Sequence, residues 1–346
     1  MAKPFKISNI TIGNEYPPVV IAEIGINHNG SLDFAISLCD TALKAGAKII
    51  KHQTHIADKE MSVEAKKIIP GNSKINIFEI IQSSQLNHED EIKMANYVRQ
   101  KKGVFISSPF SRDAVDRLCK MKVPAFKIGS GECNNYPLVE YICSKKKPII
   151  LSTGMNSIKS VRKSVSIIRK YRLPYAILHC TNIYPTPNKL VRLNCITDLK
   201  KKFPDAVVGL SDHTTSNYSC YGAVALGARV LEKHFIDKKT RKGPDIPCSM
   251  DSLELKQMID GSLAIFSSLN GEKKALKEEK KTIDFAFASI AAVKNIKKGD
   301  YFTTKNVFPL RPANGYFKVK DYNKVLGRTA KKDIKKNFQL KYSDVY

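Results

Sequence analysis

Two lysines and two histidines in this sequence could serve an anionic substrate and a metal ion: Lys51, Lys127, His213 and His234. A lysine ammonium group binds phosphate or carboxylate as a point charge. The segment 127–132 (KIGSGE) adds glycines, whose backbone N–H groups can come close to an anion. We therefore predict a site for a small phosphorylated and carboxylated molecule. A structural or Schiff-base role remains the alternative for Lys127.

The two histidines end apolar segments that would lie next to each other, so both imidazoles could reach one cation. Two nitrogen donors without cysteines at a fixed spacing argue against structural zinc. A divalent ion such as Mn²⁺ or Mg²⁺, with water and substrate oxygens completing its shell, fits better. The alternative for His213 and His234 is a place in the core or behind the site.

Glu23 lies inside the apolar segment 21–24 (IAEI). Burial would raise the pKa of its carboxyl group, whereas neighbouring cations would lower it. Either influence makes Glu23 a candidate general acid or base. A structural ion pair with Lys51 is the alternative.

Eight short apolar segments recur along the chain, separated by helical patterns such as 31–45, 157–171 and 251–269. Near-continuous apolar strands that alternate with helices indicate a parallel sheet buried on both faces. Eight such units predict a (β/α)8 TIM barrel over residues 1–270. An open doubly wound sheet is the alternative, but no GxGxxG follows the first segment. The segments are 19–26, 48–53, 104–108, 125–130, 148–153, 176–182, 207–213 and 230–235.

Polar or ionisable residues stand at the carboxyl end of all eight segments, which predicts a site at the mouth of the barrel. Ordinary solvated loop starts are the alternative. Burying Glu23, Lys51 and Lys127 among apolar strands would be costly without a purpose. Ser108, Ser130 and Ser211 would add hydroxyl groups to the same mouth.

The character of the chain changes after Asn270. Residues 271–281 (GEKKALKEEKK) are charged and have no apolar face, so we expect a linker or an exposed helix over 271–284. Short β-like pieces follow at 285–293, 301–302 and 327–330, with turn signals between them. They predict a small second domain over residues 285–346.

The composition excludes several classes of protein. The net charge of +26 invites a nucleic-acid partner, but 47 of the 58 basic residues are lysine. Arginine is the residue that reads bases and phosphates with two hydrogen bonds, so we expect no nucleic-acid partner. No apolar stretch is long enough to span a membrane, and residues 1–6 lead into no signal-like segment. Eight cysteines without CxxC spacing are typical of reduced thiols in a cytoplasmic protein.

Long segments of the chain resemble the bacterial sialic acid (N-acetylneuraminate) synthases, nearly from end to end. The family combines a (β/α)8 barrel with a C-terminal antifreeze-like (SAF) domain, which agrees with the predicted boundary. Ser108 stands where related sequences often have threonine, and the hydroxyl group is kept. The segments include AEIGINHNG (22–30), KHQTH (51–55), IPGN (69–72), FISSPFSR (105–112), KIGSGECNNYPL (127–138), ILSTGMNSI (150–158), LHCTNIYPTP (178–187), GLSDHT (209–214), LEKHF (231–235), GPDIPCSM (243–250), DFAFAS (284–289) and RPANG (311–315).

The resemblance implies an enzyme that condenses phosphoenolpyruvate with N-acetylmannosamine and water, giving N-acetylneuraminate and phosphate by C–O bond cleavage. It implies a divalent metal, Mn²⁺ in first place and Mg²⁺ or Co²⁺ as alternatives, held by His213 and His234. Glu23 matches the acid/base carboxylate. The positions that match the phosphoenolpyruvate site are Lys51, Ser108, Lys127, Ser130, Asn182, Ser211 and His213, and those that match the sugar site are Gln53, Asn72, Glu132, Tyr184 and Asp245.

The resemblance also implies a domain-swapped homodimer, in which Arg311 and Phe285 of the second domain complete the barrel site of the partner subunit. A sister enzyme that makes legionaminic or pseudaminic acid is the alternative within the family. KHQTH and NIYPTP favour the sialic acid branch. A basic carbohydrate- or nucleic-acid-binding protein is the alternative outside it.

Overall fold

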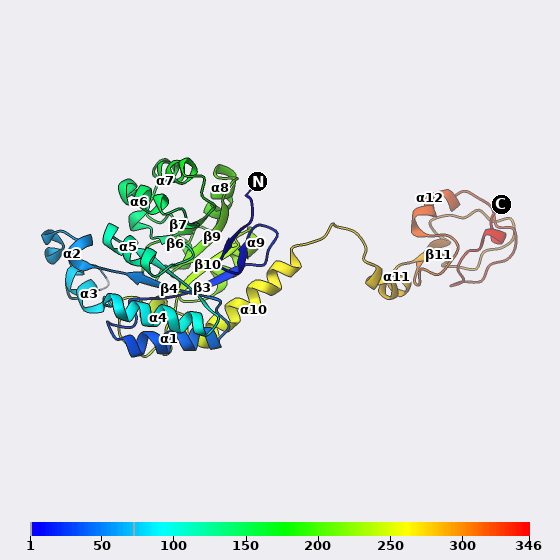
Figure 1. Cartoon of the computed structure of the whole chain (residues 1–346). Helices are drawn as coiled ribbons and strands as arrows, with labels where there is room; N and C mark the ends of the chain where they lie inside the picture. The colour runs from blue at the N-terminus through cyan, green and yellow to red at the C-terminus, as the bar shows by residue number, and fades with distance from the viewer. Residues whose placement is uncertain (1, 72) are drawn as a thin grey trace. The chain divides into compact units, whose positions relative to one another are not determined.

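The computed structural model describes residues 2–71 and 73–346 and divides into two compact units, one ending at Asn270 and one beginning at Gly271. The first unit contains a closed barrel of eight parallel strands in the order β10-β3-β4-β5-β6-β7-β8-β9 (Figure 1). The predicted TIM barrel is therefore confirmed. The barrel strands are β3 Val19–Gly25, β4 Ile49–Thr54, β5 Val104–Pro109, β6 Phe126–Ile128, β7 Ile149–Ser152, β8 Tyr175–Cys180, β9 Val207–Asp212 and β10 Val230–His234.

Helices cover the outside of the barrel, as Figure 1 shows. The side chains between helices and strands form the larger apolar core, which includes Ile24, Phe105 and Val165. Strands with both faces buried explain why their sequences read as continuous apolar runs. The helices are α1 Leu32–Lys44, α2 Ala57–Glu60, α3 Ile77–Ser84, α4 His88–Gln100, α5 Arg112–Lys120, α6 Tyr136–Ser144, α7 Ile158–Lys170, α8 Asn194–Lys202, α9 Tyr218–Ala225 and α10 Ser252–Ser268.

Local capping explains where the predicted helices begin. The hydroxyl of Ser31 accepts a hydrogen bond from the backbone N–H of Phe34 at the start of α1, and Ser157 caps α7 in the same way. Asp251 and Glu254 form a reciprocal capping box at the start of α10. All three helices lie inside the ranges predicted for them.

A short hairpin before the barrel was not predicted from the sequence. Its strands are β1 Phe5–Ile7 and β2 Ile10–Ile12, which pair antiparallel. Phe5, Ile7 and Ile12 join a second apolar cluster that contains Ile21 and Ile49, residues near the amino-terminal ends of the barrel strands. The hairpin therefore packs against the end of the barrel away from the strands' carboxyl ends.

The second unit has its own apolar core, which includes Ile290, Phe302 and Leu340. Its two-stranded sheet pairs β11 Ser289–Ala292 with β12 Val307–Leu310, and two helices, α11 Lys280–Ala286 and α12 Tyr322–Val325, belong to it. The predicted β-like piece 285–293 is wrong in its first part, because residues up to Ala286 complete α11. No helix in the described ranges is long and apolar enough to cross a membrane.

Candidate active site

Two carboxylates and two ammonium groups are buried together at the mouth of the barrel. Lys51 on β4 forms an ion pair with Glu23, its register partner on β3. Lys127 Nζ on β6 lies 3.3 Å from Oε1 of Glu232 on β10, and Lys51 Nζ lies 3.9 Å from the same oxygen. These four side chains are each at most 6 % exposed. The ion pair of Glu23 with Lys51, which the sequence left open as an alternative, is present within the predicted site.

The electrostatics of these four groups are set by burial and by one another. Burial raises the pKa of Glu23 to about 7, and the Lys51 ammonium only partly opposes this. Burial lowers the pKa of Lys127, against the attraction of the Glu232 carboxylate. Burial would also raise the pKa of Glu232, but Lys127 and Lys51 outweigh it and hold that pKa below its usual value. Glu23 is therefore the carboxyl group that can gain or lose a proton near neutral pH.

Hydroxyl and amide groups surround the lysines. Ser108 Oγ accepts a hydrogen bond from Lys51 Nζ at 3.3 Å, and Ser211 Oγ donates to Glu232 Oε1 at 3.1 Å. Ser130 Oγ accepts from the backbone N–H of Gly154 at 3.0 Å. Gly154 is required here, because a Cβ atom at this position would overlap Oδ1 of Asn182 and lie 2.8 Å from Ser130 Oγ. The predicted serines and Asn182 thus belong to the same mouth as the lysines.

The two predicted histidines face each other at the ends of β9 and β10. Their ring centroids are 5.5 Å apart, and the Tyr184 ring lies 4.1 Å from that of His213. Nδ1–H of His213 donates to the backbone carbonyl of Thr181 at 2.9 Å, so the neutral ring carries its lone pair on Nε2. Burial lowers the pKa of His213, but Cys180 and the Thr181 carbonyl outweigh burial and raise it above its usual value. Burial lowers the pKa of His234 well below its usual value, so this imidazole is neutral. Neutral imidazoles are the form that binds a metal ion.

The residues present fit a divalent cation in part. Nδ1 of His234 is buried without a hydrogen-bond partner and lies 3.7 Å from the Asp245 carboxylate. No group of three or more His, Cys, Asp or Glu residues that could hold a metal occurs among residues 2–71 and 73–346. Protein ligands would therefore be few, and water or substrate oxygens would have to complete the shell.

The structure brings only some of the predicted sugar contacts close to the four buried charged groups. Gln53 Nε2 donates to Glu23 Oε1 at 3.3 Å, which brings Gln53 into the site. Glu132 is half-buried and accepts a hydrogen bond from Asn135, its neighbour in the following turn. Phe285 and Arg311 belong to the second unit, where both are exposed. Asn72 lies outside the described residues.

Glu232 is the residue that the sequence reasoning missed as a site member. The sequence places it only among the polar residues at the carboxyl end of the eighth segment, 230–235. Alternation along β10 provides the signal: Glu232 and His234 point to the site, whereas Lys233 between them pairs with Asp212 and with the carbonyl of Thr214.

A barrel with buried ionisable groups at the carboxyl ends of its strands is typical of a (β/α)8-barrel enzyme. The model of the NeuB family matches residues 38–274, and the model of the SAF domain matches residues 287–345. The chain therefore belongs to the NeuB family, whose members are phosphoenolpyruvate-dependent synthases of nonulosonic acids and generally use a divalent metal. It carries a C-terminal SAF domain, as the resemblance implied.

Relatives with named products cover nearly the whole chain. The N,N'-diacetyllegionaminic acid synthase of Campylobacter jejuni is 35 % identical over 328 residues, covering 92 % of this chain and 97 % of its own length. The pseudaminic acid synthase of the same organism is 37 % identical, with 94 % and 96 % covered. Among solved structures, an N-acetylneuraminic acid synthetase from Leptospira borgpetersenii is similar with a TM-score of 0.75 and 28 % identity, covering 82 % of this chain and 96 % of that one.

Proposed function

We propose that the barrel mouth condenses phosphoenolpyruvate with an N-acylated amino-sugar aldehyde and water, giving a nine-carbon 2-keto acid and phosphate. The observation that carries this proposal is the pair of buried ammonium groups, Lys51 and Lys127, beside two facing imidazoles. Both lysines and the hydroxyl groups of Ser108, Ser130 and Ser211 would bind the phosphate and carboxylate of phosphoenolpyruvate, together with Asn182. Glu23 and Glu232 compensate the two buried ammonium groups when no substrate is bound, and an anionic substrate would compete with these carboxylates for the same groups.

The chemistry follows from the groups at hand. The enol carbon attacks the aldehyde carbon, whose oxygen takes up a proton to become a hydroxyl group, and water then adds at the carbon that bears phosphate. Glu23, with a pKa of about 7, takes the first proton from this water. The second proton of this water leaves with the phosphate when the keto group forms. Lys51 and Lys127 neutralise the phosphate as its C–O bond breaks. His213 and His234 would hold a divalent ion, Mn²⁺ in first place and Mg²⁺ or Co²⁺ as alternatives, which when bound supplies Lewis-acid polarisation of the aldehyde.

Two classes of sugar are candidates for the acceptor. The segments KHQTH (51–55) and NIYPTP (182–187) favour N-acetylmannosamine, which would make the product N-acetylneuraminate. The named relatives at 35 and 37 % identity make legionaminic and pseudaminic acids, so the comparisons support an acceptor with two acylamino groups better. Gln53, Glu132, Tyr184 and Asp245 are the proposed sugar contacts, together with Asn72.

A homodimer completed by the SAF domain is part of the proposal. Apolar side chains are exposed on both units: Ile69 is 61 % exposed in the segment that follows β4, and Phe285 and Phe287 are 62 and 60 % exposed in the second unit. Exposed apolar side chains favour burial against another surface. We place Phe285 and Arg311 at the acyl group of the sugar in the partner subunit's barrel. A cytoplasmic location, and the absence of nucleic-acid and membrane partners, stay predictions.

A phosphate-release assay with each acceptor tests the function. The full chain receives phosphoenolpyruvate with N-acetylmannosamine or with the diacetamido precursors of legionaminic and pseudaminic acid. We expect release with only one class, and only with a divalent metal, and a nine-carbon keto acid in the mass spectrum. A heavy oxygen isotope in the bridging position of phosphoenolpyruvate should leave with the phosphate. Phosphate release without any sugar, or equal release from the doubly substituted His213→Ala/His234→Ala protein, would contradict the proposal.

A further inference from the structure

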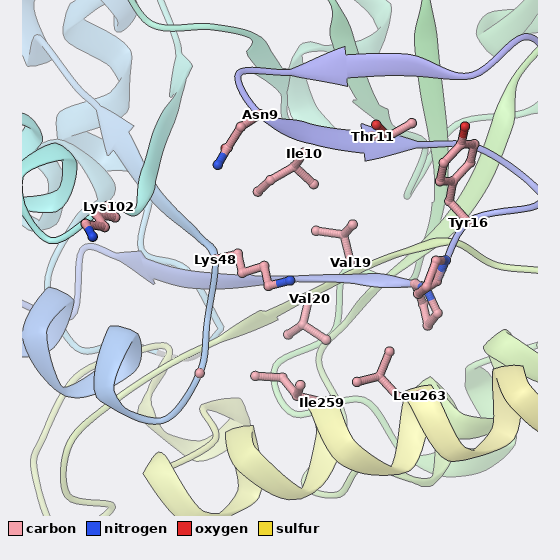
Figure 2. Close-up of a pocket in the computed structure, with 13 residues that line it drawn as sticks. Asn9, Ile10, Thr11, Tyr16, Val19, Val20, Lys48, Lys102, Ile259 and Leu263 are labelled. Carbon is pink, nitrogen blue, oxygen red and sulfur yellow. The ribbon is translucent and has the colours of Figure 1, made fainter.

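A pocket of about 450 Å³ lies at the end of the barrel opposite the site described above. It is lined by Val19 and Val20, which begin β3, and by Lys48 and Lys102, which precede β4 and β5. Figure 2 shows it between the hairpin, the start of β3 and α10. Because Glu23 lies three residues further along β3 than Val20, the pocket is separated from the mouth by about 10 Å of strand.

The walls of this pocket are apolar. Ile10 of the hairpin lies on one side, and Ile259 and Leu263 of α10 lie on the other. Ile259 and Leu263 are four residues apart and so share one face of the helix. Leu263 lines the pocket and is 41 % exposed. A volume of this size with apolar walls is in the range of small-molecule sites.

The rim of the pocket is polar, and most of its polar side chains are exposed to solvent. The side chains of Asn9, Thr11, Tyr16, Lys48 and Lys102 make no hydrogen bond or ion pair with any part of the chain that the structure describes. The lining residues include two ammonium groups and no carboxylate. In Figure 2 the Lys48 side chain reaches between the hairpin and α10, whereas Lys102 lies at one edge.

We propose that this pocket binds a small amphipathic anion, namely a carboxylate carried on an aromatic or branched aliphatic body. The apolar walls would take the body, and Lys48 would meet the carboxylate, with the hydroxyl and amide groups of the rim as further donors. The charge of the rim selects an anion over a neutral or cationic molecule of the same shape. This inference does not depend on the proposed function, because it uses none of the residues at the mouth.

The test uses 3-phenylpropionate as the probe and its neutral amide as the matched ligand. Binding to the full chain is followed by saturation-transfer NMR and calorimetry. We expect saturable binding of the carboxylate, about fivefold tighter than that of the amide. Lys48→Gln should remove this difference, and Lys59→Gln, at an exposed lysine of α2 outside the pocket, should keep it. Leu263→Trp should fill the pocket and abolish binding of both ligands.

The cooperative urea-unfolding transition serves as the folding control, so the test does not depend on the proposed function. This transition should be unchanged in Lys48→Gln and Leu263→Trp. Equal affinities for carboxylate and amide, unchanged binding in Lys48→Gln, or no saturable binding up to about 10 mM would each overturn the proposal. Because Lys48→Gln is a substitution at an exposed position, the test stands even if Leu263→Trp fails to fold.

Discussion

Each lysine at the mouth of the barrel is paired with a carboxylate of the same barrel, Lys51 with Glu23 and Lys127 with Glu232. When Glu23 is ionised the four charges cancel, which makes their common burial tolerable. These four groups can also bind an anionic substrate, since the anion can compete with the two carboxylates for the same ammonium groups. The pairs are therefore compatible with both a structural and a catalytic role.

Lys127→Met should weaken phosphoenolpyruvate binding more than sugar binding. The substitution removes a charge-assisted contact that contributes about 1.5–3 kcal/mol, which corresponds to about a 10- to 150-fold rise in the apparent Michaelis constant for phosphoenolpyruvate. Steady-state kinetics with each substrate varied in turn measure the two effects. Lys120→Met, at an exposed lysine at the end of α5, is the control. An unchanged constant for phosphoenolpyruvate in Lys127→Met would refute the assignment.

The pKa of Glu23 predicts how activity depends on pH. If the deprotonated carboxylate accepts the proton of water, kcat/KM should rise with pH and level off above about 7. Glu23→Gln should lower kcat/KM and remove this limb. Ionisation of phosphoenolpyruvate itself would affect both proteins alike, so the comparison of the two profiles isolates Glu23. Identical pH profiles for the two proteins would assign the limb to another group.

The sequence predicted that Glu23, Lys51 and Lys127 would meet at one mouth, because a TIM barrel brings all strand ends together, and the structure places them there. Their roles stay predictions. The sequence did not predict which carboxylate pairs with which lysine. That pairing depends on strand neighbours: β3 and β10 are adjacent only because the barrel closes, so Glu23 and Glu232 come together from opposite ends of the unit.

At the scale of elements, a buried polar chain joins β4 to two helices on the outside of the barrel. Nδ1 of His28 accepts a hydrogen bond from the backbone N–H of Gly30, so the proton of the neutral His28 ring is on Nε2. This Nε2–H donates to Nε2 of His52 at 3.1 Å. His52 Nδ1 lies 3.5 Å from Glu91 of α4, and Arg117 of α5 lies 3.1 Å from the other carboxylate oxygen of Glu91. The His52 side chain points to the opposite face of β4 from Lys51 and Gln53. Its hydrogen-bonded chain therefore holds the face of β4 that turns away from the site.

Because Glu91 is buried, we expect the free energy of unfolding to fall as pH rises. Burial raises the pKa of Glu91 from 4.5 to about 7, so the folded state holds this proton more tightly than the unfolded chain. The contribution of this proton to the free energy of unfolding is complete below pH 4.5 and is lost as pH rises through about 7. The total loss is roughly 3 kcal/mol. Urea unfolding gives the free energy of unfolding at pH 5 and at pH 8. The decrease between these two pH values should be smaller for Glu91→Gln than for the wild type. Equal changes would contradict this assignment.

The elements themselves were predictable where they are long and periodic. The eight strands and the helices α1, α7 and α10 match their predicted ranges closely. The hairpin at residues 5–12 was missed because strands of three residues carry too little alternation to be recognised. In the second unit, β12 contains Pro309. A proline in the sequence argues against predicting a strand, although a proline is tolerated in a strand at the edge of a sheet.

At the scale of the whole molecule, the proposed exchange of SAF domains has a direct test. An inactive His213→Ala chain mixed with an inactive Arg311→Ala chain should regain part of the phosphate release, because some heterodimers then contain one intact site. Subunit exchange is checked by mass spectrometry of chains of different length. If subunits exchange and activity stays absent, each site is completed within its own chain.

The exposed segment 271–279 connects two units that each have their own apolar core. It carries Lys273, Lys274 and Lys277, which trypsin can cut. In the proposed dimer, the intact tether would keep the SAF domain at a high effective concentration near the barrels. After cleavage both fragments should stay folded, but their encounter becomes bimolecular. The nicked enzyme should therefore lose specific activity on dilution at concentrations where the intact dimer does not.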